Sequence, residues 1–243
     1  MLLQGFGQEI EFGATTPVLL NFIAWILMIL LFGILLVRMI LIYRQEKVRT
    51  TIYFASYFIL TLISAVIGLA MTLYNFGWTW LPFTEDWTLL LFCFQIVAVS
   101  FLLVSAFDMA DRFRFWSIAA LIAIIGIILS AISFLVPEYA LPVRILLLLV
   151  QFIATLPVII IFLWVFKKVR SGKALAFALG LMVNYFTLAF ILSLMVITNS
   201  GEIFPVAELA ANSYGLGSII GTVIIFTGLM GWIDRYILGN IEE

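Results

Sequence analysis

Seven long apolar runs, separated by short polar loops, constrain this 243-residue chain more than any other feature. A helix needs about 20 apolar residues to cross the hydrocarbon core of a bilayer. Backbone groups in lipid must be hydrogen-bonded within their own segment, so runs of this length are expected to be helical. The runs cover residues 17–43, 51–76, 86–108, 115–136, 141–166, 174–198 and 213–238. We therefore predict an all-α integral membrane protein, with residues 1–243 forming a single domain of seven transmembrane helices.

Composition supports this class. The chain is 65% hydrophobic and 10% charged, whereas a soluble domain carries about 25% charged residues. Lys and Arg accumulate in the cytoplasmic loops of membrane proteins, and seven alternating helices place every basic residue except Arg144 on one side. We therefore expect the N-terminus outside, the C-terminus in the cytoplasm, and a multi-pass location in the cell membrane.

Several kinds of site lack the residues that they need. The chain has no histidine and a single cysteine, Cys93, which argues against metal, haem and iron–sulfur sites. Seven helices in this orientation resemble the retinal-binding rhodopsins, but the predicted seventh helix lacks the lysine for a Schiff base. No Asp or Glu lies at the centre of a run, which disfavours a proton pump, and no nucleophile has a histidine or buried carboxylate beside it. We expect no enzyme activity, no catalytic residues, no metal and no cofactor.

The polar residues inside the predicted helices are uncharged. The four amides are Asn21, Gln95, Gln151 and Asn184, and several Ser and Thr residues accompany them. A neutral polar interior suits a neutral solute or ligand. We therefore treat these four amides as candidate interior polar residues.

The first three predicted helices resemble the last three. A shift of 123 residues places the basic loop 44–50 on 167–173 without a gap, and the triplet 111–113 on 234–236. Helices one and five would point the same way, which gives a parallel 3+1+3 repeat with helix four as the connector. This arrangement is similar to that of sugar-efflux (SWEET) transporters, although the chain lacks their Pro-Gln pairs. The alternative is that positive-inside loops alone produce the likeness.

The triplet Asp111-Arg112-Phe113 also resembles the Asp-Arg-Tyr motif that ends the third helix of rhodopsin-like G-protein-coupled receptors. The other motifs of those receptors, Asn-Pro-x-x-Tyr and Cys-Trp-x-Pro, are absent. One prediction is a network between the cytoplasmic ends of helices three and seven. The alternative is local acid–base pairing on one helix and anchoring to lipid phosphates. The candidate residues are Asp108, Asp111, Arg112, Asp234 and Arg235.

The seventh predicted helix is rich in glycine. Gly217 and Gly221 are four residues apart, a spacing that lets another backbone approach closely, and Gly228 continues the series. We expect this face to pack on another helix, within the bundle or in a second copy.

Three functional classes remain open. A receptor-like or interaction module without its own output domain would signal through a protein partner. A facilitator would let a neutral solute pass between two three-helix halves, and a structural subunit would support a larger membrane complex. The expected partners are the lipid bilayer and either another protein or a second copy, but no nucleic acid. The orientation, the neutral interior and the basic inner loops favour the first class, which is the leading prediction. The neutral polar interior also suits the second class, and the apparent repeat supports it.

Overall fold

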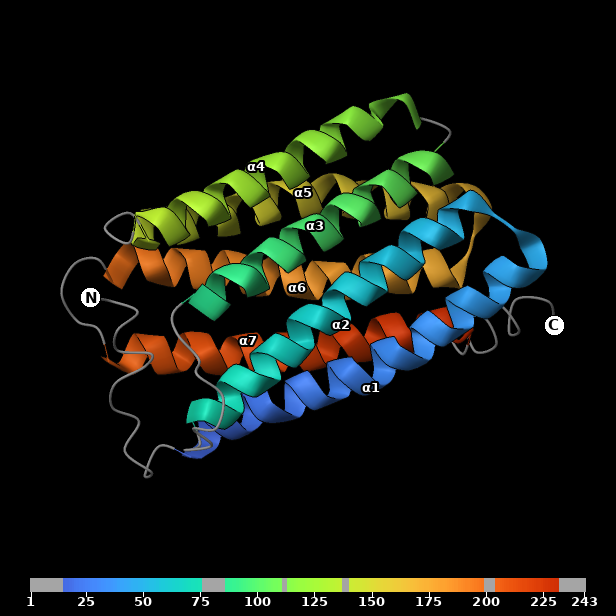
Figure 1. The fold of residues 1–243 in the computed structure, drawn as a ribbon. Helices are drawn as coiled ribbons and strands as arrows, with labels where there is room; N and C mark the ends of the chain where they lie inside the picture. The colour runs from blue at the N-terminus through green and yellow to red at the C-terminus, as the bar shows by residue number, and fades with distance from the viewer. Residues whose placement is uncertain (1–14, 76–85, 111–112, 137–139, 199–203, 232–243) are drawn as a thin grey trace.

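The computed structural model of the chain describes residues 15–75, 86–110, 113–136, 140–198 and 204–231 (Figure 1). These residues form an all-helical bundle, as predicted. Its elements are α1 (Thr15–Glu46), α2 (Arg49–Asn75), α3 (Asp86–Met109), the short 3-10 helix η2 (Phe113–Phe115), α4 (Trp116–Leu135), α5 (Ala140–Val169), α6 (Gly172–Thr198) and α7 (Phe204–Leu229).

Among the described residues, four helical segments are long and apolar enough to cross a membrane. Shorter apolar segments lie within α4 and α7. Many large apolar side chains point away from the bundle, including Leu30 and Ile160, which are 57% and 56% exposed. Such a surface fits lipid rather than water. The chain is a polytopic membrane protein. The four long segments are Leu19–Glu46, Arg49–Tyr74, Leu90–Met109 and Ile145–Val169.

The last helix lies earlier in the chain than predicted. α7 begins at Phe204 instead of residue 213 and ends at Leu229 instead of residue 238. Gly231 has a φ of 78° and donates its N–H to the carbonyl oxygen of Gly228 at 2.9 Å. A left-handed glycine just beyond the last turn ends a helix. The sequence prediction was wrong because it followed the apolar pattern through this glycine.

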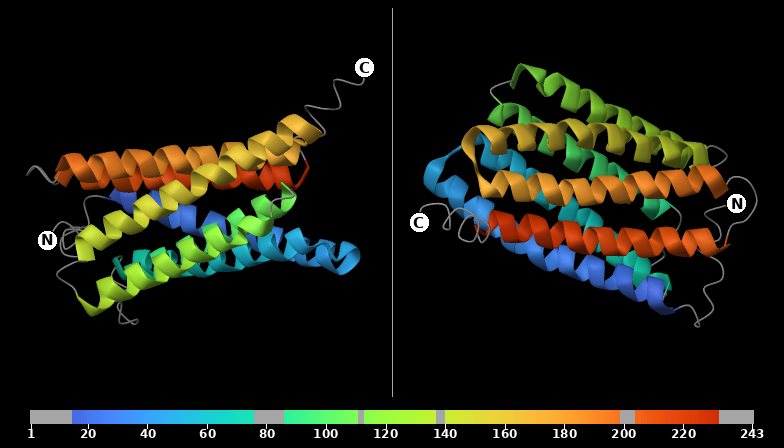
Figure 2. Two further views of the ribbon diagram at one scale, coloured as in Figure 1. Left: turned by 90° about the horizontal axis from the view of Figure 1, so that it is seen from above. Right: turned by 180° about the vertical axis from the view of Figure 1, so that it is seen from behind.

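Six helices form a closed ring, and α4 lies outside it (Figures 1 and 2). Around the ring, α1 packs on α2, α2 on α3, α3 on α5, α5 on α6, α6 on α7, and α7 on α1. The outlying α4 packs against α3 and α5. The ring therefore contains the first three and the last three helices, with α4 as a peripheral connector.

Successive helices run in opposite directions, so their connections alternate between two ends of the bundle (Figure 1). One end holds the turns α1–α2 and α5–α6, the start of α4 and the last turn of α7. We call it the basic end because every described basic residue except Arg144 lies there. Arg144, near the start of α5, belongs to the opposite end. The described basic residues of the basic end are Arg38, Arg44, Lys47, Arg49, Arg114, Lys167, Lys168, Arg170 and Lys173.

Candidate functional site

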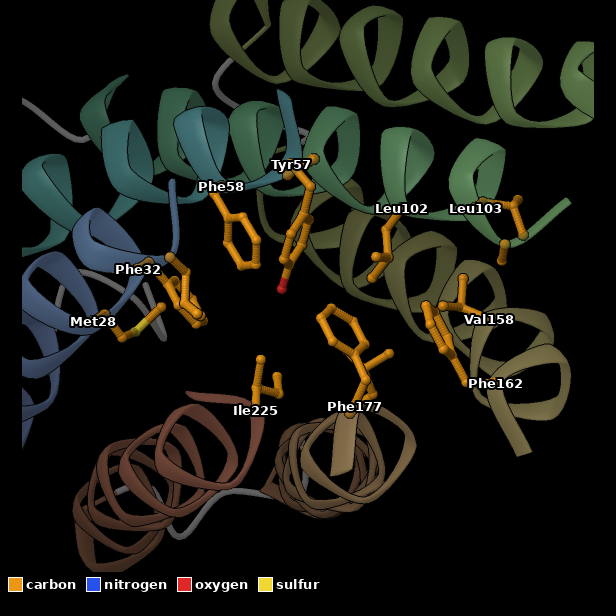
Figure 3. Packing of buried hydrophobic residues seen from close by; sticks show 14 of the residues in the cluster. Met28, Phe32, Tyr57, Phe58, Leu102, Leu103, Val158, Phe162, Phe177 and Ile225 are labelled. Carbon is orange, nitrogen blue, oxygen red and sulfur yellow. The ribbon is translucent and has the colours of Figure 1, made fainter. Parts of the chain in front are cut away.

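The centre of the ring is filled by aromatic side chains (Figure 3). Phe177 of α6 stacks on Phe162 of α5, with ring centroids 4.8 Å apart, and meets Phe54 of α2 edge-on at 5.4 Å. It also contacts Tyr57 at 6.2 Å. Phe177 is fully buried. Its ring contacts join α6 to α5 and α2 across the ring of helices. We call the whole set the aromatic cluster: Phe32, Phe54, Tyr57, Phe58, Phe162 and Phe177.

The aromatic cluster is centred nearer the basic end than the opposite end. Phe177 is five residues from the start of α6 and Phe162 seven from the end of α5, which at 1.5 Å per residue is about 8–10 Å along the helices. Ile225 of α7 and Leu102 of α3 close the remaining sides, both fully buried. The bundle is therefore tightly packed across its centre at this level.

The four candidate amides lie on four different helices. Asn21 lies in α1, Gln95 in α3, Gln151 in α5 and Asn184 in α6. From the helix bounds, they lie about 9–21 Å from the end opposite the basic end. All four are half-buried. Asn21, Gln95 and Gln151 therefore lie in the other half of the bundle from Phe177 and Phe162, and Asn184 lies at the middle of α6.

Two of these amides carry buried oxygens with no hydrogen-bond partner among the described residues: Oδ1 of Asn21 and Oε1 of Gln151. The hydroxyls of α5 and α6 behave differently, because two of them donate to carbonyls of their own helices. Thr155 donates to the carbonyl of Gln151 at 2.7 Å, and Thr187 to that of Val183 at 2.8 Å. An unsatisfied buried acceptor costs about 1–3 kcal/mol. These two oxygens are therefore the polar atoms that a hydrogen-bond donor of a solute would best satisfy.

Glycines bring α7 close to α1 and α6. A Cβ on Gly217 would lie 2.1 Å from Oγ1 of Thr187, and one on Gly215 would lie 2.9 Å from Oδ1 of Asn21. At Gly221 it would lie 2.8 Å from Oδ1 of Asn184 and 2.9 Å from the carbonyl oxygen of Gly180. The predicted face thus lies against α6 within the bundle, and Gly228 is buried near the end of α7.

The charged candidates of the basic end divide into two groups. Asp108, on α3, accepts a hydrogen bond from the hydroxyl of Thr50 at the start of α2. Asp111, Arg112, Asp234 and Arg235 lie outside the described residues, so the proposed link between the ends of α3 and α7 remains a prediction.

Residues 123 positions apart adopt matching structures at the basic end. Lys47 and Arg170 are the described non-glycine residues with positive φ, at 52° and 51°. Each donates its N–H to the carbonyl four residues earlier, at 2.9 and 2.7 Å. The helix ends match as well, because α1 and α5 stop at 46 and 169, and α2 and α6 cover 49–75 and 172–198.

No protein-family model, curated protein sequence or solved structure matches the chain.

The aromatic cluster is the feature that sequence reasoning missed. One signal was present, because Phe54 and Phe177 are identical residues at the 123-residue shift. They meet at the centre of the ring. An identity between the two halves therefore marked a contact between them.

Proposed function

We propose that the chain is a facilitator for a small neutral polar solute, built from two three-helix halves, α1–α3 and α5–α7. The observation that carries this proposal is the 123-residue equivalence of the two turns, where Lys47 and Arg170 share one left-handed conformation. A non-glycine residue seldom adopts positive φ. Two such residues at the same position of two matching helix pairs favour a parallel repeat over a likeness produced by charge alone.

Parallel repeats suit transport by rocking. In transporters of this kind, substrate sites lie near the middle of the bilayer at the interface between repeats, and the repeats move against each other. Here the two interfaces between the halves are α3 with α5 and α7 with α1. The unpaired oxygens of Gln151 and Asn21 belong to α5 and α1, which each take part in one of these interfaces. Their chemistry favours a solute that carries hydrogen-bond donors and no charge.

In this account the structure is closed at the basic end. The aromatic cluster blocks the centre there, and Phe177 acts as the inner gate because its ring contacts residues of both halves. The excess of basic residues indicates that this end faces the cytoplasm. We therefore propose seven spans with the N-terminus outside. Opening would separate Phe177 from Phe54 as the halves tilt.

A second candidate is the receptor-like module. The observation in its favour is the packed centre. In this candidate a ligand binds at the amides, and the aromatic cluster relays the change of packing to a partner at the basic end. Such a protein would move no solute by itself. Flux therefore separates the two candidates.

The test is solute flux in proteoliposomes. Purified protein is reconstituted, and shrinking and reswelling after an osmotic step are followed by light scattering with glycerol, urea and small polyols. The proposal expects reswelling faster than in empty liposomes for at least one solute, and faster still for Phe177→Leu. Phe190→Leu is the matched control, because Phe190 is on the same helix but 42% exposed at the surface. Equal rates in empty, wild-type and Phe177→Leu liposomes would exclude the facilitator and leave the receptor-like module.

A further inference from the structure

The residues at the ends of α3 and α7 lie beside equivalent residues of α2 and α6 but carry different charges. In the first half, the hydroxyl of Thr50 donates to the carboxylate of Asp108. The residues 123 positions further on are Lys173 and Gly231, and these also lie together. The Cε atom of Lys173 is 3.9 Å from the position of a Cβ on Gly231. A hydroxyl beside a carboxylate in the first half thus becomes a cation beside a glycine in the second.

A second cation, from α1, contacts the residue before Gly231. Arg38 places its Nη1 3.2 Å from Sδ of Met230, the residue directly before Gly231. A thioether sulfur is a weak acceptor, whereas a guanidinium carries five N–H donors. Two adjacent residues just beyond the end of α7 therefore each have a cationic side chain beside them, one from α1 and one from α6.

The described acidic residues of this end do not supply a counter-charge. They are Glu46 and Asp108. Asp108 accepts the hydroxyl of Thr50 in the other half. Glu46 lies eight residues beyond Arg38 on the same helix, which is about 12 Å along its axis.

We propose that Arg38 and Lys173 bind the phosphate group of an anionic lipid from the leaflet at the basic end. The phosphate supplies, beside Lys173, the negative charge that Asp108 supplies beside Thr50 in the first half. Guanidinium and ammonium groups together bind a phosphate through charge-assisted hydrogen bonds, and basic pockets between transmembrane helices bind lipid head groups.

The surroundings of Arg38 favour a lipid over a free anion. Arg38 lies about 12 Å along α1 from its end, at a depth where long basic side chains extend toward the head groups. Its neighbours Val37 and Leu41 are 58% and 52% exposed. They offer an apolar surface to acyl chains on the same stretch of α1 as Arg38, which a free phosphate would not use.

The alternative is that the two cations only offset the negative end of the α7 helix dipole. The two accounts differ at Gly231. A carboxylate at this position would place a negative charge beside Lys173 and would compete with a bound phosphate. It would leave Arg38 and Lys173 beside the end of α7, so the cations could still interact with the helix dipole.

The experiment therefore compares Gly231→Asp with Gly231→Asn. Both variants impose the same side-chain size on a backbone with positive φ, and only the first adds a carboxylate. Thermal unfolding of the full chain in detergent is measured with dioctanoyl phosphatidylglycerol, dioctanoyl phosphatidylcholine or inorganic phosphate added. The wild type and Gly231→Asn should gain several degrees with phosphatidylglycerol and clearly less with the other two. Gly231→Asp should lose most of that gain.

A charge-matched pair of double variants provides the second readout. Arg38→Gln with Lys173→Gln should abolish the response to phosphatidylglycerol. Arg44→Gln with Lys167→Gln removes the same charge from exposed positions of the same end and should keep it. Equal responses of all variants would overturn the site. A response to inorganic phosphate as large as that to phosphatidylglycerol would overturn the assignment to a lipid.

Discussion

Replacing Gly221 by alanine tests how closely α7 approaches α6. The added Cβ would lie 2.9 Å from the carbonyl oxygen of Gly180 and 2.8 Å from Oδ1 of Asn184. The amide of Asn184 can turn away, but the carbonyl belongs to the backbone of α6. The two helices must therefore move apart. The loss of packing extends to the neighbouring close approach of Gly217 to Thr187.

The magnitude follows from two opposing effects. Alanine is favoured over glycine inside a helix by about 1 kcal/mol, whereas overpacking costs about 1–3 kcal/mol. The matched control is Gly33→Ala in α1, where a Cβ would meet nothing within 4 Å. Gly33→Ala should gain only the helix preference for alanine, about 1 kcal/mol, without an overpacking cost. The two variants should thus differ by about 1–3 kcal/mol in unfolding free energy, which is about 2–12 °C in melting temperature for a chain of this size.

The assay is thermal unfolding in one detergent, followed by intrinsic tryptophan fluorescence. Gly33→Ala should melt at or above the wild-type temperature, and Gly221→Ala below it. If both variants melt together at or above the wild type, α7 does not approach α6 as the structure describes, and the reasoning on the glycine face fails.

Three further predictions address the polar groups. Gln151→Leu should leave the melting temperature unchanged or raise it, because it removes a buried acceptor without a partner, while solute flux falls; a loss of stability would show that Oε1 is bonded in the protein. Thr50→Val and Asp108→Asn should each destabilise the protein, and their double variant should lose less than the sum by about 0.5–3 kcal/mol; strict additivity would contradict the hydrogen bond between α2 and α3. On a Cys93-free background, Lys47→Cys should resist an impermeant thiol reagent in intact cells and Glu202→Cys should react, and the reverse pattern would contradict the orientation.

The helical class was predictable because lipid allows few alternatives. Apolar runs of about 20 residues must satisfy their backbone internally, and the structure has one helix over each run. The end of α7 was not predictable from hydropathy, since Gly231 interrupts an apolar stretch without changing its composition. Its effect comes from the left-handed backbone.

The aromatic cluster could not be read from the sequence for a different reason. In a soluble helix the apolar stripe marks the core, but a membrane helix is apolar all round. Phe177 is fully buried and Phe190 is 42% exposed, although both lie on α6 in similar apolar sequence. With 23 phenylalanines in the chain, no pattern ranks them. Glycine spacing was more informative, because glycines four residues apart, such as Gly217 and Gly221, favour the close approach of another helix.

The central claim is that two equivalent halves move apart at the basic end. Its most direct test is the distance between spin labels at positions 46 and 169, the equivalent ends of α1 and α5, measured by double electron–electron resonance on a Cys93-free background in nanodiscs. The account predicts two distances, with the longer one more populated in Phe177→Leu and unchanged in Phe190→Leu. A single narrow distance that Phe177→Leu does not alter would contradict it.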